Sequence, residues 1–144
     1  MKIDPFEYIR QKPEMFWGPR GPSAQNLISG MVEQLIILGC EAIKLYSKNG
    51  WYFLGAESDW ISGVIPDGEN IEYPFKHMQG FPEANVGGAP RSEIFFYDFA
   101  ERLIVWYKEQ AILLKGDPEP EFNNYFQSKY GNGVALAFYG NTYV

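Results

Sequence analysis

The sequence predicts an α+β fold in which helices pack on one face of a mixed, mostly antiparallel sheet, as a two-layer α/β sandwich. Three observations predict it: an amphipathic helical pattern before residue 39, a hairpin signal at Asn49-Gly50, and a helix followed by three strand patterns after residue 90. This order favours a layer of helices against one sheet. The 144 residues are enough for one domain with a sizeable core, so we expect a single domain over residues 1–144.

Two helices are predicted before the first strand. Asp4 can cap a short helix that has Pro5 at its first position, and Pro13 ends the apolar pattern. Ser23 can cap the main helix, which Gly39 is expected to end. The apolar residues of the main helix recur at steps of three and four: Leu27, Ile28, Met31, Leu35 and Leu38.

The next segment is typical of a β-hairpin. Ala42–Ser47 alternates between apolar and polar residues, Asn49-Gly50 suits a tight turn with positive φ angles, and Trp51–Leu54 returns. Gly55–Gly88 is rich in Gly, Pro and acidic residues, which predicts an irregular segment with a short helix near Tyr73–Met78.

The last third of the chain predicts one helix and three strands. Ser92 can cap a helix that continues to about Ala100. Strands are expected at Arg102–Tyr107, Ala111–Lys115 and Val134–Tyr139.

Composition excludes several classes of function. Twelve basic and 18 acidic residues give a formal charge of −6, which argues against nucleic acid and anionic membranes and favours a basic protein partner. The N-terminus carries acids where a signal peptide has an apolar run, and Leu35–Cys40 is too short to span a membrane. Cys40 and His77 are the single residues of their kinds, so we expect no disulfide, no zinc site and a cytoplasmic location.

Three sequence blocks carry a resemblance to a known family. Tyr8–Gly18, Y-I-R-Q-K-P-E-M-F-W-G, resembles the R-K-R-P-x-M-Y-I-G segment near the start of the type II topoisomerase ATPase domain, the DNA gyrase B family. Residues 87–116 resemble that family's glycine-rich lid, helix and hairpin, and Gly131–Tyr139 resembles its closing G-T-x-V-x-F-W strand. The order of the blocks also agrees, so the chain resembles a degenerate relative of the gyrase B-type (GHKL) ATPase domain, whose fold is an α/β sandwich.

The resemblance implies where ATP chemistry would occur. In the family, a glutamate on the main helix activates water, and an asparagine four residues later holds Mg²⁺. One alignment places Glu33 and Ile37 at these positions, and the other places Leu27 and Met31 there. An aliphatic side chain has no oxygen for Mg²⁺. We therefore expect that the domain is not an enzyme, has lost ATP hydrolysis and needs no metal or cofactor.

The resemblance also marks a residual nucleotide pocket. In the stretch G-A-E-S-D-W-I-S-G, Glu57 or Asp59 could replace the carboxylate of the family's D-x-G-x-G motif, although the plainer interpretation is that both are solvent-exposed loop acids. Trp60 would crowd a base or fill the pocket itself. In the segment that resembles the family's glycine-rich lid, only Gly87 and Gly88 match its glycines. Arg91 either contacts an anion at the start of the helix or is simply exposed.

Aromatic side chains suggest a different kind of site. Neighbouring strand residues point to opposite faces of a sheet, so some rings among Trp51, Tyr52 and Trp106 must leave the core, unless they only cover ordinary surface. Exposed Trp and Tyr are common anchors of protein interfaces. Trp60 is a fourth candidate contact residue.

These observations lead to one expected function and two alternatives. We expect a non-catalytic domain that acts by binding another protein, as regulatory and immunity-type proteins do, through the aromatic residues named above. The alternative is small-molecule or nucleotide binding, without efficient hydrolysis, in a residual pocket formed by Glu33, Glu57, Asp59, Gly87 and Gly88. A further expectation is a homodimer formed by edge-strand pairing through Val134–Tyr139.

Overall fold

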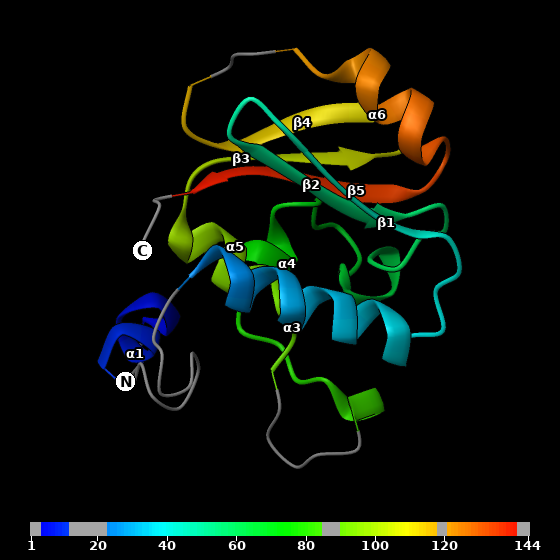
Figure 1. Cartoon of the computed structure of the whole chain (residues 1–144). Helices are drawn as coiled ribbons and strands as arrows, with labels where there is room; N and C mark the ends of the chain where they lie inside the picture. Colours follow the sequence, from blue (N-terminus) through cyan, green and yellow to red (C-terminus); the bar gives the residue numbers. More distant parts are fainter. Residues whose placement is uncertain (1–3, 12–22, 85–89, 118–120, 141–144) are drawn as a thin grey trace.

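The computed structural model describes residues 4–11, 23–84, 90–117 and 121–140. It is an α+β fold built on a five-stranded open sheet with the order β1-β2-β5-β3-β4. All four neighbouring strand pairs are antiparallel. Figure 1 shows α3, α4 and α5 beneath the sheet and α6 above it. The predicted α+β fold class is confirmed. The expectation that all helices lie on one face is corrected by α6, which the sequence did not predict and which packs on the other face of the sheet.

The first two described helices begin as predicted. In α1 (Pro5–Gln11), the Phe6 N–H donates to Asp4 Oδ1 at 3.0 Å. In α3 (Ala24–Ile37), the Asn26 N–H donates to Ser23 Oγ at 3.1 Å. Gly39 ends α3 with a φ of +80°. The N–H groups of Gly39 and Cys40 then bond to two carbonyl oxygens of the last helical turn, a Schellman motif.

Two hairpins and one inserted strand form the sheet. β1 (Ile43–Lys48) and β2 (Trp51–Ala56) are joined by Asn49 and Gly50, whose φ angles of 51° and 85° confirm the tight turn. β3 (Ala100–Tyr107) and β4 (Gln110–Lys115) form the second hairpin.

β5 (Val134–Gly140) lies between the two hairpins, paired with β2 on one side and β3 on the other. Both of its edges are therefore occupied. The expected homodimer through edge pairing of Val134–Tyr139 is wrong, because β5 is the central strand of the sheet. Among the described residues, the outer edges belong to β1 and β4.

The main core lies between the sheet and the lower helices. The expected short helix is present as α4 (Tyr73–Lys76), and α5 (Glu93–Phe99) follows the irregular segment. Two short 3-10 helices, η1 (Ser62–Val64) and η2 (Pro82–Ala84), lie within that segment. The largest fully buried side chains of this layer are Ile9, Met31, Leu35, Leu54, Ile61, Phe75, Ile94, Phe96 and Phe138.

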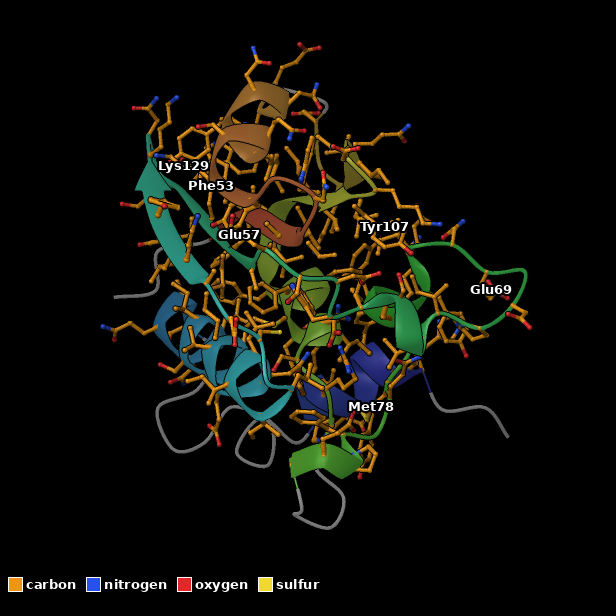
Figure 2. All side chains as sticks on the ribbon, turned by 90° about the vertical axis from the view of Figure 1, so that its right-hand side faces the viewer. Phe53, Glu57, Glu69, Met78, Tyr107 and Lys129 are labelled. Atoms are coloured by element: carbon orange, nitrogen blue, oxygen red, sulfur yellow. The ribbon has the colours of Figure 1, made fainter. Side chains whose placement is uncertain are left out.

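A second, aromatic core lies between the upper face of the sheet and α6 (Asn123–Tyr130). Figure 2 marks Phe53, whose ring packs on that of Phe126 with centroids 5.5 Å apart. Trp51 and Trp106 are only 3% and 2% exposed. The Trp106 ring stacks on Phe126, and its Nε1–H donates to a backbone carbonyl at 2.9 Å. The expectation that these two tryptophans form an exposed contact surface is therefore wrong, because α6 covers them.

Candidate functional site

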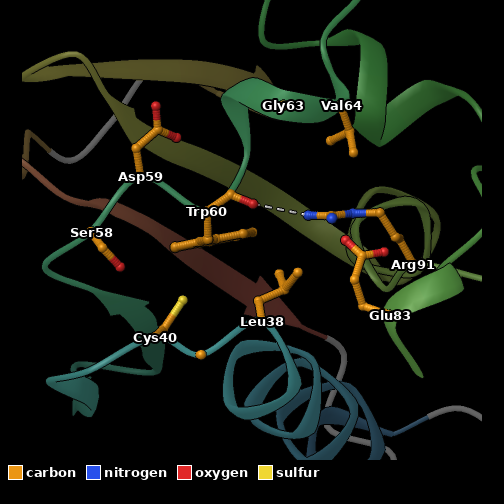
Figure 3. A pocket seen from close by; sticks show the side chains of 10 residues that line it. Leu38, Cys40, Ser58, Asp59, Trp60, Gly63, Val64, Glu83 and Arg91 are labelled. Atoms are coloured by element: carbon orange, nitrogen blue, oxygen red, sulfur yellow. Dashed lines mark hydrogen bonds between the residues drawn. The ribbon is translucent and has the colours of Figure 1, made fainter. Parts of the chain in front are cut away.

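A cavity of about 430 Å³ lies where α3 ends, next to the loop that follows β2 (Figure 3). The end of α3 contributes residues 38–40, the loop contributes residues 58–60, and η1 contributes residues 63 and 64. Glu83 from η2 and Arg91 from the segment before α5 complete the lining. Segments distant in sequence are thus brought together beneath one end of the sheet.

Trp60 is the central aromatic side chain of this cavity. It is buried, and its indole Nε1–H donates to the Val134 carbonyl oxygen at 2.9 Å. Its own carbonyl oxygen accepts a hydrogen bond from Arg91 Nη2 at 3.1 Å. The expectation that Trp60 is an exposed contact residue is wrong, because these bonds tie it to the sheet and to the base of α5. The ring lines the cavity without filling it.

Asp59 stands beside Trp60 and accepts hydrogen bonds from the backbone at the start of η1. Its Oδ1 accepts hydrogen bonds from the N–H groups of Ile61 at 3.1 Å and Ser62 at 3.0 Å, and its Oδ2 accepts from Ser62 Oγ. Burial alone would raise the pKa of Asp59. The hydrogen bonds from Ser62 and Ile61, together with the positive charge of Lys108, outweigh burial and hold the pKa below its ordinary value. The Asp59 carboxylate is therefore negatively charged at neutral pH.

A buried ion pair that includes Arg91 lies across the cavity from Asp59. The Arg91 side chain is 4% exposed and that of Glu93 1%, with 2.7 Å between Arg91 Nη2 and Glu93 Oε2. Gln34 Nε2, on α3, donates to Glu93 Oε1 at 3.2 Å, and Gln34 Oε1 accepts the Ser92 N–H at 2.7 Å. The network joins α3 to α5. The expected exposure of Arg91 is wrong because this carboxylate neutralises it inside the protein, and Ser92 makes no side-chain cap.

The cavity unites only some of the predicted ligand-binding residues. Asp59 lines it, but Glu57 is exposed outside it and forms an ion pair with Lys44, 3.4 Å between Oε2 and Nζ. Glu33 is exposed on α3 and is not part of the lining. Gly87 and Gly88 lie outside the described residues.

Tyr52, the remaining predicted contact residue, is half-buried on the lower face of the sheet, with its ring stacked on Phe138 at 5.4 Å. It is the only one of the four predicted aromatic contacts that keeps partial exposure. It is therefore a partly exposed residue at most, not an anchor at the centre of an aromatic patch.

The positions implied for ATP chemistry do not meet at the cavity. Leu27 and Met31 are buried in the main core, whereas Ile37 is partly exposed at the end of α3. Within the described ranges, no group of three or more His, Cys, Asp and Glu side chains could hold a metal ion. The polar and aromatic lining groups that can contact a ligand are the Trp60 ring, two carboxylates, a neutralised arginine, the Ser58 hydroxyl and the Cys40 thiol.

A second hollow of about 560 Å³ lies on the other side of the sheet, between the β1–β2 turn and the start of α6. Its walls include Lys48, Glu121 and an edge of Trp51.

In the described part of the chain, no helix is both long and apolar enough to cross a bilayer.

Comparisons of this chain with family models, with curated proteins and with solved structures found no match. The resemblance to the gyrase B-type ATPase domain therefore stays a prediction that depends on the three ordered sequence blocks.

Proposed function

We propose that this chain is a non-catalytic binding domain that holds a small molecule in the cavity beside Trp60. The cavity itself carries the proposal. Its volume of about 430 Å³ falls within the roughly 300–1,000 Å³ typical of small-molecule sites. It also has the usual composition of such sites, because apolar and aromatic walls surround a few fixed polar groups.

The absence of catalysis is part of the proposal. Neither alignment of the main helix directs an oxygen ligand toward the cavity: Glu33 is exposed away from the lining, and Leu27 and Met31 are buried core residues. Asp59 is held charged by hydrogen bonds that lower its pKa, which makes it a weak general base at neutral pH. The groups present suit recognition of a ligand better than turnover.

Cys40 provides a direct assay because it lines the cavity and is the only cysteine of the chain. The rate of its alkylation by neutral iodoacetamide can be followed by intact mass while a fragment set is screened. We expect compounds that bind in the cavity to slow alkylation in a saturable manner. Protein already modified at Cys40 with N-ethylmaleimide should no longer bind these compounds in calorimetry.

A matched pair of glycine variants provides the control. A Cβ added at Gly63, which lines the cavity, or at Gly80, which does not, would meet no atom within 4 Å. We expect Gly63→Leu to weaken protection of Cys40 by bound fragments and Gly80→Leu to leave it unchanged. The proposal fails if no fragment slows alkylation, or if Gly63→Leu and Gly80→Leu behave alike.

Exposed apolar residues favour a second candidate function, the binding of a basic protein by a regulatory or immunity-type domain. Ile36 on α3 is 62% exposed and Leu45 on β1 49% exposed, and the chain carries a formal charge of −6. The test is in-cell crosslinking in the native host. A specific partner should be lost with Ile36→Asp and kept with Ile36→Val, and equal recovery with both variants would exclude this surface.

A further inference from the structure

We propose that the cavity beside Trp60 selects an organic cation, an alkylammonium or alkylguanidinium group with a short apolar stem, rather than a phosphate-bearing ligand. The inference depends on the proposed function and specifies the chemistry of its ligand. Three independent features of the lining support it: a helix end, the balance of charges and an aromatic ring.

The cavity faces the C-terminal end of α3. This helix has 14 residues, and residues 38–40, immediately after it, line the cavity. The aligned peptide dipoles of an α-helix place about half a negative charge at its C-terminus. That end attracts cations and repels phosphate, the reverse of the helix N-termini that bind phosphate groups.

The charged side chains of the lining have a negative balance. Arg91 is the one cation among them, and Glu93 neutralises it through bonds at 2.7 Å and 3.0 Å. Asp59 and Glu83 are the two carboxylates of the lining. Glu83 forms no ion pair with any described residue, and Lys108 is the cation that acts on Asp59. Lys108 is not part of the lining, so the further negative charge of a phosphate would face these two carboxylates with no unneutralised cation of the lining to offset it.

The aromatic ring of Trp60 is the third feature that favours a cation. Figure 3 shows its ring between Asp59 and the end of α3, with Arg91 and Glu83 farther along the cavity. The indole face attracts a cation within about 6 Å of its centre, and indole is the best of the aromatic side chains for this interaction. Leu38 and Val64 supply apolar surface for the methylene stem of the ligand.

The test uses three probes that differ in charge. Agmatine carries an ammonium and a guanidinium on a four-carbon stem, butylurea is a neutral relative, and AMP is an anion with a flat base. Binding is measured by isothermal titration and by protection of Cys40 from iodoacetamide. We expect agmatine to bind and to protect Cys40, and we expect butylurea and AMP to do neither.

Charge variants locate the interaction. Glu83→Gln should weaken agmatine binding about tenfold, the loss expected for one charge-assisted hydrogen bond. Glu69→Gln removes the same charge from an exposed residue that does not line the cavity and that Figure 2 shows on a loop, so it should leave binding unchanged. Equal loss in both variants would show attraction by net charge alone and would overturn the inference.

A further comparison distinguishes whether the cation belongs to a protein partner or to a free amine. Tighter binding of the peptide Gly-Gly-Arg-Gly-Gly than of agmatine, with no binding of its Gln counterpart, would assign the site to an arginine of a protein partner. Tighter binding of agmatine would assign it to a free amine. If AMP or neutral fragments protect Cys40 and neither cation does, the cation inference fails while the proposed function stands. If no probe or fragment protects Cys40, both fail.

Discussion

Removal of one partner from the buried ion pair should reveal how strongly it supports the fold. Glu93→Ala would leave the Arg91 guanidinium inside the protein without its carboxylate and would also remove the acceptor of the Gln34 amide. Breaking a buried pair costs about 3–5 kcal/mol, and because Arg91 borders a cavity that water can enter, we expect about 3 kcal/mol. That loss is a large fraction of the roughly 5–15 kcal/mol that stabilises a typical domain.

Urea unfolding followed by tryptophan fluorescence measures this loss as a change in midpoint at constant slope. The Glu72–Lys76 pair is the control, because its side chains are 42% and 40% exposed and its atoms lie 3.5 Å apart one helical turn from each other. Glu72→Ala should cost only about 0.3–0.5 kcal/mol. The double variant Arg91→Met/Glu93→Leu should recover part of the loss, because it leaves no unpaired charge but still removes the partners of the Gln34 amide and the Trp60 carbonyl. A cost below about 1 kcal/mol for Glu93→Ala would refute the reasoning.

The remaining predictions concern packing and pH. Trp106→Phe should cost about 1–2 kcal/mol in urea unfolding, because it keeps an aromatic ring on Phe126 but leaves the Gly131 carbonyl without its donor; a neutral result would contradict the buried position. Gly55→Ala should prevent stable folding, since its Cβ would overlap the Val134 carbonyl oxygen, and loss of the native circular dichroism spectrum would show this. The native pKa of Asp59 is below its ordinary value near 3.8, so its contribution to stability is present above about pH 4 and is lost as the pH falls through the lower native pKa. Asp59→Asn should flatten the fall in unfolding free energy below pH 4, and an unchanged profile would contradict the assignment.

Local signals predicted the elements that depend on a few adjacent residues. Ser23, Gly39 and Asn49-Gly50 occupy the cap and turn positions expected from the sequence, because capping and positive φ are properties of short segments. The alternation of residues likewise located the strands within a residue or two.

Tertiary packing decided what the sequence did not predict. The α6 sequence N-N-Y-F-Q-S-K-Y contains few strong helix formers, and its helix is supported by Phe126 and Tyr130, which are buried against the sheet. Because the sequence does not predict α6, it leads to the expectation that Trp51 and Trp106 are exposed. The position of β5 between the two hairpins depends on pairing over long sequence distances, which periodicity does not reveal.

The sequence predicted only part of the site, because the rest depends on which distant residues pack together. Asp59 and Trp60 lie in the stretch that only resembles the family's second motif, and both line the cavity. The Arg91–Glu93 pair was missed because burial of a charge is visible only when its partners are placed. One signal was present: Gln34 lies on the apolar face of the main helix between Met31 and Leu38, where a polar residue requires a buried partner.

The central claim is that the cavity beside Trp60 binds an organic cation, and the Trp60 indole N–H reports on that binding directly. In ¹H–¹⁵N spectra, with the indole signals assigned by single Trp→Phe variants, agmatine should shift the Trp60 signal in a saturable manner. The signal of Trp106, on the opposite face of the sheet beneath α6, should not move. A Trp60 signal that stays in place while agmatine binds elsewhere, or equal movement of both signals, would contradict the account.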